Sequence, residues 1–330
     1  LSPTYYTGLV GKYLNTWDIG RPLPTLDWSA VVPRGTAKFF KQTYLVNGEA
    51  KHINKSNSQQ VVDYGLEFLD KASKQNEPYF LVLAFAAPHF PAKPDPKDIG
   101  RFKKKNLYNP KYVLNNAKKF DKFIKNDVNF QKRQSDTLYS LDRALTRLYS
   151  EIDFSNTMVI FMSDNGLMHG EQGLFSKAAP YEESTKVPMF IRYDPLIDKH
   201  YEYKNLVAHL DLTATAYSLA GVTPTRQIDG VSLEPTFRNN SDPVRENLLL
   251  EGWRDHWKAT YRSNYMGILT NDRLKLVRNE NDRSEVYDLN RDQYEMHNLF
   301  YKPAEQTLVR DMERKLDDLL MEVRGHTGWE

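Results

Sequence analysis

The amino-acid sequence predicts an α/β fold, with a doubly wound, mostly parallel sheet as its core and a smaller C-terminal antiparallel sheet plus a helix. Three observations predict it. Continuous apolar runs such as YFLVLAFAAPH, which starts at Tyr79, are typical of strands that are covered on both faces of a parallel sheet. Segments with helical spacing of apolar residues alternate with these runs. After about Asn240 the chain changes to short strand-like pieces separated by Asn and Asp turns.

The predicted elements of the core follow in order. Residues 58–73 repeat apolar side chains at helical spacing, and Glu77-Pro78 ends that segment before a strand over residues 79–87. Residues 134–150 carry leucines three or four positions apart, which predicts a helix that leads into a strand over residues 157–162. The segment KVPMFIRYDP then predicts another strand, and NLVAHLDLTATAYSLAGV predicts a further helix.

The C-terminal part of the chain predicts a separate small unit. RENLLLEG, YMGILTNDRLKLVRN and SEVYDL are short strand-like pieces, and a polar-apolar helix follows over residues 303–323. We therefore predict an α/β core over residues 1–240 and a C-terminal α+β subdomain over residues 241–330.

The composition excludes several classes of protein. The 330 residues hold 45 Lys and Arg against 43 Asp and Glu, so the net charge does not indicate nucleic-acid binding. The absence of cysteine excludes disulfides, thiolate metal sites and a cysteine nucleophile. No apolar segment approaches the ~20 residues that a membrane span needs. The segment from Lys93 to Arg133 is strongly basic; we interpret it as a solvated insertion, with a docking surface for an anionic polymer as the alternative.

Two groups of polar residues lie where open α/β sheets bind their ligands, beyond the carboxyl ends of strands. His89 follows the strand over residues 79–87, and Asp164-Asn165 follows the strand over residues 157–162. A carboxylate and an amide oxygen suit Ca²⁺, with Mg²⁺ as the alternative. From the residues alone, an Asx-type turn, a loop histidine and, at Lys177, a solvated surface lysine remain open interpretations.

Seven blocks occur in a fixed order over nearly the whole chain: GLVGKYLN, FAAPHFP, FMSDNGLMHGEQGLFSK, YEESTKVPMFIR, AHLDLTAT, IDGVSL and EVYDLNRDQYEMHNL. Together they resemble the type I sulfatase family of the alkaline-phosphatase superfamily. GKYLN, with the segment TLDWSAVVPRGTAKFF, most resembles the N-acetylglucosamine-6-sulfatase branch. The loop DNGLMHGEQGLFSK also resembles bacterial arylsulfatase-like members.

The resemblance implies a role for each matching residue. Asp164 and Asn165 match ligands of a calcium ion. Lys12 matches the lysine that contacts the nucleophile and the sulfate, and Lys177 matches the lysine that holds a sulfate oxygen. His89 matches the histidine that protonates the leaving alcohol. Such roles suit sulfate-ester cleavage, because cations stabilise the charge that develops on the oxygens and a proton donor neutralises the leaving group.

Two positions differ from the family pattern, and a third has two interpretations. Leu14 stands where many family members have a histidine, so no second acid is assigned there. Gln172 stands where bacterial relatives often have a histidine. His169 has two interpretations, contact with substrate or a position at the end of the loop.

The family's attacking group has no match in this chain. It is a formylglycine made from Cys or Ser in a Cys/Ser-x-Pro-x-Arg motif, and it precedes the Gly-Lys block together with paired Asp residues of the metal site. We therefore expect an N-terminal portion with the formylglycine to be missing, and the chain alone to be inactive. SDPVR, from Ser241 to Arg245, fits the pattern formally, but it leads into a strand instead of a helix, so we reject it.

The sequence thus predicts a sulfuric ester hydrolase that uses Ca²⁺ and acts on a sulfated sugar or glycosaminoglycan. The same resemblance implies an extracytoplasmic location, which is periplasmic, secreted or lysosomal. Two alternatives remain: a phosphate or phosphonate monoesterase of the same superfamily, and a non-catalytic protein that binds sulfated glycans through its basic segment. Neither a nucleic-acid partner nor a membrane span is predicted, and the sequence gives no oligomeric state.

Overall fold

The structure is a computed structural model that describes residues 4–15, 17, 23, 25–35, 37–102, 117–238, 242–253, 261 and 263–329, and of residues 117–128 only the backbone. It divides into two compact units. The first comprises Leu1–Asn109 and Lys118–Asp153, and the second comprises Pro110–Ala117 and Phe154–Glu330. The second unit includes both sides of the boundary predicted at residue 240, and that boundary stays a prediction.

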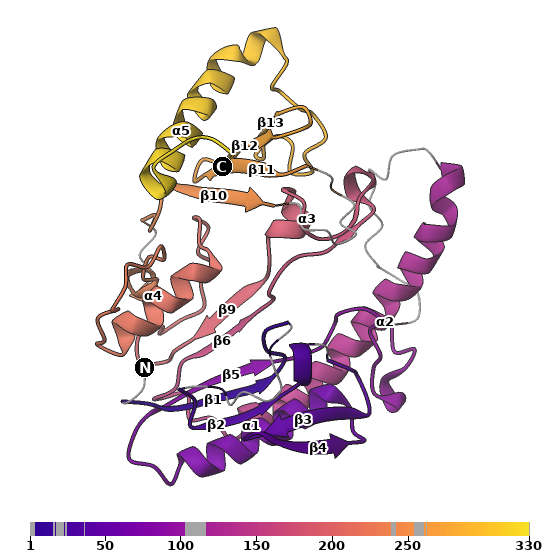
Figure 1. Ribbon diagram of the computed structural model, residues 1–330, viewed down its shortest axis with the longest axis vertical. Helices are drawn as coiled ribbons and strands as arrows, with labels where there is room; N and C mark the ends of the chain where they lie inside the picture. Colours follow the sequence, from indigo (N-terminus) through magenta and orange to yellow (C-terminus); the bar gives the residue numbers. More distant parts are fainter. Residues whose placement is uncertain are drawn as a thin grey trace. The chain divides into compact units, whose positions relative to one another are not determined.

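The first unit is built on a five-stranded sheet (Figure 1). Strand β1 pairs in parallel with β2 and with β5, whereas β3 and β4 extend the β2 side as antiparallel strands. This sheet is therefore mixed, where the apolar runs predict mostly parallel pairing. Its strands are β1 (Tyr6–Gly11), β2 (Trp28–Val31), β3 (Gln42–Val46), β4 (Glu49–Ile53) and β5 (Tyr79–Ala84).

Two helices belong to this unit. Helix α1 (Asn57–Ala72) packs on β1 and β5, and its fully buried Phe68 stacks against Tyr6 with ring centroids 5.2 Å apart. Gly8 permits this packing, because a Cβ there would lie 2.3 Å from the Phe68 ring. Helix α2 (Ala117–Tyr149) starts well before the predicted residue 134. Short 3-10 helices are η1 (Pro33–Gly35) and η2 (Pro96–Asp98).

The second unit contains the next predicted strands and helix. Strand β6 (Val159–Met162) pairs with β9 (Met189–Arg192), and the pairing is antiparallel. A short hairpin of β7 (Met168–His169) and β8 (Phe175–Ser176) follows β6. The helices here are α3 (Glu182–Thr185), α4 (His209–Leu219), η3 (Glu171–Gly173) and η4 (Glu234–Arg238).

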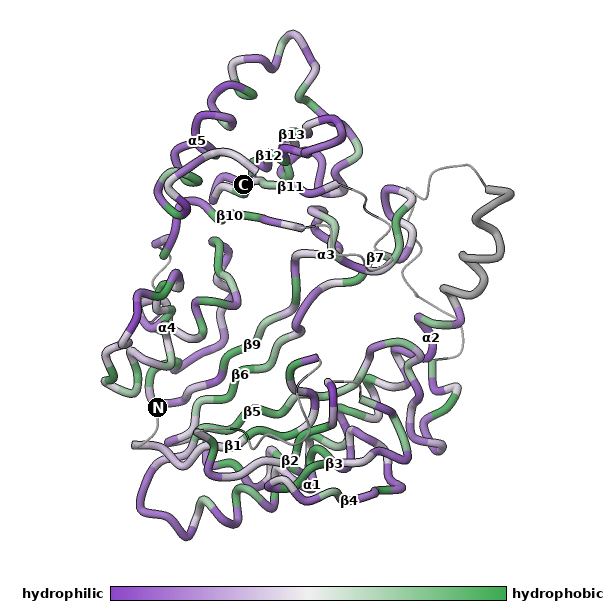
Figure 2. Tube along the Cα trace, in the orientation of Figure 1, coloured by the Kyte–Doolittle hydropathy of each residue, from purple (hydrophilic) through white to green (hydrophobic). Residues whose placement is uncertain are grey.

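The predicted antiparallel sheet with a closing helix is confirmed at the C-terminal end. Helix α5 buries Val309, Met312, Leu316 and Leu320, which are three or four residues apart, against the sheet. Figure 2 shows the alternation of hydrophobic and hydrophilic residues along this helix. The elements are β10 (Asn247–Gly252), β11 (Tyr265–Thr270), β12 (Leu274–Asn279), β13 (Glu285–Asp288), η5 (Pro303–Glu305) and α5 (Gln306–Arg324).

The predicted α/β class, with a small C-terminal antiparallel sheet and helix, is therefore confirmed. Within the described part of the chain, no helix has both the length and the apolar character needed to cross a bilayer.

Candidate functional site

Lys12 and His89 lie at one edge of the first unit's sheet. Lys12 follows β1, His89 lies in the loop after β5, and these two strands are parallel neighbours with Gly11 opposite Ala84. The Lys12 amide donates a hydrogen bond of 2.9 Å to the Ala84 carbonyl. Gly11 is required for this close approach, because its φ is 97° and a Cβ would lie 2.0 Å from the Ala84 oxygen.

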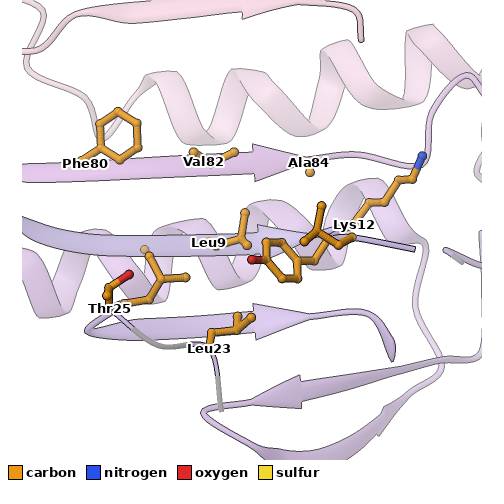
Figure 3. Close-up of a pocket in the computed structure, with 11 residues that line it drawn as sticks. Leu9, Lys12, Leu23, Thr25, Phe80, Val82 and Ala84 are labelled. Atoms are coloured by element: carbon orange, nitrogen blue, oxygen red, sulfur yellow. The ribbon is translucent and has the colours of Figure 1, made fainter. Parts of the chain in front are cut away.

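Lys12 also lines a trough of about 480 Å³ on this sheet (Figure 3). Apolar side chains from β1 and β5 dominate the trough, and Phe80 and Val82 are about 40% exposed there. The Lys12 side chain extends toward the C-terminal ends of these strands in Figure 3. Of the described residues that line the trough, Lys12 is the charged one, so its ammonium group supplies positive charge to the trough.

The loop that carries His89 is held from several sides. The Asn57 side-chain oxygen accepts from the Ala86 amide at 3.0 Å, and Arg133 Nε donates to the Pro91 carbonyl at 3.0 Å. The His89 ring is exposed, and its Nδ1 donates to the Phe90 carbonyl at 2.8 Å. Because a carbonyl can only accept, Nδ1 carries a proton in this bond and Nε2 is the nitrogen available for proton exchange.

Asn165 and Lys177 meet in the second unit. Asp164, Asn165 and Gly166 form the turn after β6, and Lys177 follows β8. Lys177 Nζ donates to Asn165 Oδ1 at 2.7 Å, while the Asp164 side chain is exposed. The structure therefore brings together the amide and the lysine that the sequence places twelve residues apart.

The backbone around Lys177 is in an unusual conformation. Ser176 and Ala178, on either side of it, have φ values of 78° and 69°, in the left-handed region that non-glycine residues seldom adopt. Such conformations persist only where the surrounding structure determines them, and they are concentrated at functional sites. The hairpin thus presents Lys177 at an energetic cost.

His169 lies in β7 of the same hairpin, opposite Phe175 of β8. Its backbone amide donates to Glu171 Oε2 at 2.5 Å. This contact fixes the start of the loop. The role of the His169 ring stays a prediction.

The donor set suits calcium only in part. Asp164 offers a carboxylate and Asn165 a carbonyl oxygen, which are hard donors of the kind Ca²⁺ takes. Calcium takes six to eight oxygens, however, and Asn165 Oδ1 already accepts from Lys177. Among the residues that the structure describes, no group of three or more His, Cys, Asp or Glu side chains is arranged to hold a metal ion. These two residues therefore fit a calcium ion as part of a larger ligand set.

Several buried charged residues near the hairpin that carries Lys177 were not predicted from the sequence. Glu171 is 1% exposed, and Lys275 and Glu295 form an ion pair whose side chains are fully buried. Burial raises the pKa of the nearby Glu183 to about 7, and the charges of Glu171 and Glu295 raise it as well, whereas Lys275 lowers it. Charged residues are usually solvated, so the sequence gives no sign of this cluster beyond the block that contains Glu295.

We expect Glu183→Gln to change how stability depends on pH. The folded pKa is about 7 against an ordinary value of 4.5. Protonated Glu183 therefore contributes stability that is complete below pH 4.5 and is lost as pH rises through 7, by at most roughly 3 kcal/mol before solvent screening. Urea unfolding should show that the free energy of unfolding of the variant, relative to that of the wild type, is higher at pH 8 than at pH 5. Glu202→Gln, at an exposed position, should show no such difference; equal curves for Glu183→Gln and wild type would contradict the raised pKa.

The arginine of SDPVR takes part in the fold of the second unit. Arg245 forms an ion pair with Asp211, whose side chain is fully buried at the start of α4. Asp211 also accepts hydrogen bonds from the amides of Ala208 and Val231. Ser241 lies outside the described residues, as do the side chains of residues 103–128 in the basic segment.

Comparison with known proteins gives consistent results. The sulfatase family model matches residues 3–222, and the model of the C-terminal part of N-sulphoglucosamine sulphohydrolase matches residues 170–322. Human N-acetylglucosamine-6-sulfatase is 32% identical over 286 residues, which cover 75% of this chain and 50% of the human protein. An extracellular sulfatase homologue of Drosophila melanogaster is 27% identical over 269 residues, which cover 74% of this chain and 24% of the fly protein.

Solved structures share the fold. A protein in complex with its substrate D-glucosamine-2-N,6-O-disulfate superposes with a TM-score of 0.85 at 19% identity, over 97% of this chain and 80% of that one. The chain spans half the length of the human relative and about a quarter of the fly relative.

Proposed function

We propose that this chain, which belongs to the sulfatase family, supplies the sulfate-holding residues of a sulfuric ester hydrolase that acts on a sulfated sugar. The observation that carries the proposal is the contact between Lys177 and Asn165, in which a lysine on strained backbone meets the amide of the turn after β6. A lysine ammonium held in place beyond a strand end, by an amide oxygen that accepts one of its hydrogen bonds, suits the recognition of a small anion.

Two lysines hold the sulfate group in this proposal. Lys177 donates from Nζ to a sulfate oxygen, and the contact with Asn165 keeps its side chain directed toward that position. Lys12 supplies a second positive charge from the edge of the first unit's sheet. Positive groups fixed in place before reaction stabilise the charge that develops on the sulfate oxygens.

His89 protonates the leaving alcohol. Its Nδ1 is occupied by the Phe90 carbonyl, so the imidazolium donates from Nε2. The ring is exposed, which leaves it accessible to a substrate oxygen. His169 contacts the substrate from the hairpin that also carries Lys177.

Asp164 and Asn165 would contribute oxygen ligands to a calcium ion, with Mg²⁺ as the alternative. When bound, such an ion stabilises negative charge on the sulfate. The remaining ligands, and a formylglycine that would supply the attacking group, are proposed to lie outside this chain. Two facts support that division: the chain has no cysteine, and it spans only half the length of the human relative.

A sulfated glucosamine is the proposed substrate class. The human relative is an N-acetylglucosamine-6-sulfatase by name, and a solved structure of the same fold holds a disulfated glucosamine. An extracytoplasmic location is proposed with it, since one relative is named as an extracellular sulfatase.

The test compares the purified 330-residue chain with the product of its whole gene, using nitrocatechol sulfate as substrate. We expect the chain alone to be inactive, and the whole product to hydrolyse the ester and lose activity when calcium is chelated. An aryl phosphate serves as the control substrate and should be cleaved more slowly. Calcium-dependent turnover by the chain alone would contradict an external nucleophile and reopen Ser241, and faster phosphate cleavage would favour the phosphatase alternative.

A further inference from the structure

Lys275 and Glu295 form a buried ion pair that neither the sequence resemblance nor the proposed chemistry explains. Lys275 Nζ lies 2.6 Å from Glu295 Oε1, and neither side chain is exposed. Removing two charges from water costs about as much as their attraction returns, so a pair of this kind is a weak source of stability. The other contacts of the pair indicate its role.

Glu295 contacts two segments that flank the candidate site. Its Oε2 accepts a hydrogen bond of 2.7 Å from the backbone amide of Glu182, the first residue of α3. Its backbone carbonyl accepts from Gln172 Nε2, also at 2.7 Å, and the Tyr294 carbonyl accepts from the same nitrogen at 3.0 Å. Glu295 therefore joins α3 to the turn η3, although Gln172 lies 123 residues away in the sequence.

The two residues in this contact are both in left-handed conformations. Gln172 has a φ of 53° and Glu295 a φ of 55°. Non-glycine residues adopt this conformation only where their surroundings compensate for it. The hydrogen bonds between the two segments supply such compensation, which indicates that this arrangement is specifically maintained.

Both segments lead directly to the candidate residues. From α3, the Ser184 carbonyl accepts from the Gly166 amide at 2.9 Å, which fixes the turn that carries Asp164 and Asn165. From η3, the chain continues into β8 and Lys177. A continuous series of contacts thus runs from Glu295 to both partners of the Lys177–Asn165 bond.

We propose that Glu295, oriented by Lys275, is a positioning residue that holds the Asp164–Gly166 turn and the Lys177 hairpin in their mutual geometry. Lys275 binds one carboxylate oxygen, which leaves the other directed at the Glu182 amide. The catalytic consequence rests on the proposed function, but the positioning itself does not.

The experiment measures hydrogen exchange in three double variants of the full chain. Lys275→Met with Glu295→Gln removes both charges and keeps an oxygen acceptor for the Glu182 amide. Lys275→Met with Glu295→Leu removes the acceptor as well. Arg278→Met with Asp317→Leu is the control for the loss of an ion pair from the same strand, because it removes a partly exposed pair that joins β12 to α5 instead of to α3.

The proposal predicts different results for the two test variants. With leucine at position 295, exchange of the Gly166 amide and over residues 182–186 should rise about tenfold, as expected when a buried amide loses its partner. The contact with Gln172 is made by the backbone carbonyl of residue 295 and stays available in every variant. With glutamine, exchange should stay near the wild-type rate, and exchange in β11 and β12 should be unchanged in both. The control pair should leave the loop protected.

Equal exchange in the leucine and glutamine variants would overturn the proposal, as would increased exchange throughout the C-terminal sheet, which indicates a purely structural pair. The measurement needs no turnover. If the loop responds as expected and the whole gene product cleaves no sulfate ester, the proposed function fails while the positioning role stands.

Discussion

Replacing Lys177 by alanine is expected to lower turnover of a sulfate ester about 10²- to 10³-fold in the whole gene product, since removing one charge-stabilising donor typically costs that much. Lys177 makes its hydrogen bond to Asn165 from a half-buried position on the hairpin. Its loss should leave the melting temperature nearly unchanged, because a partly exposed polar contact contributes only about 1 kcal/mol to stability.

The measurement is kcat on nitrocatechol sulfate beside a thermal unfolding curve. Lys199→Ala is the matched control, because Lys199 is an exposed lysine of the same unit and should keep full activity. Lys177→Arg keeps the charge and should retain part of the turnover. A loss of stability that accounts for the lost activity would assign Lys177 a structural role instead.

Replacing Gly166 by alanine is the second change with a large expected effect. A Cβ at this position would lie 2.2 Å from the Glu183 carbonyl oxygen, and that atom belongs to backbone that cannot rotate away. The turn or α3 must therefore move, and the hydrogen bond from the Gly166 amide to the Ser184 carbonyl is lost or lengthened. Overpacking of this kind costs about 1–3 kcal/mol, with about 1 kcal/mol more for the hydrogen bond.

Turnover should fall along with stability in Gly166→Ala, because the displaced turn carries Asn165 away from Lys177. Urea unfolding of the 330-residue chain measures the first effect, and kcat of the whole gene product measures the second. Gly328→Ala is the control, since a Cβ there meets its nearest atom at 3.8 Å. A Gly166→Ala protein with wild-type stability would show that α3 and the turn are not in fixed contact.

Local patterns were sufficient to predict several elements. The apolar face of α5 and the continuous run of β5 appear in the sequence as periodicity, because each element buries side chains that are close neighbours along the chain. Strands β1 to β4 were not predicted. β4 in particular reads EAKHI, and its exposed position at the edge of the sheet leaves no alternating apolar pattern.

The sequence did not predict the direction in which the strands pair. The antiparallel pairing of β6 with β9 and the mixed order of the first sheet depend on how distant strands meet. An apolar strand has the same composition in either direction, so composition cannot distinguish the two arrangements.

For the candidate site, the sequence by itself determined that polar residues such as Asp164 follow the ends of apolar strands, because these residues are neighbours of the strands along the chain. Ligands bind at such strand ends in open α/β sheets, so these residues could be selected as candidates. Only the tertiary structure decided that Lys275 and Glu295 are fully buried and form an ion pair. The identity of a charged residue in a sequence does not show whether its side chain is buried. Whether it is solvated or holds a distant turn in place depends on which segments pack around it, and packing is set by contacts between residues far apart along the chain.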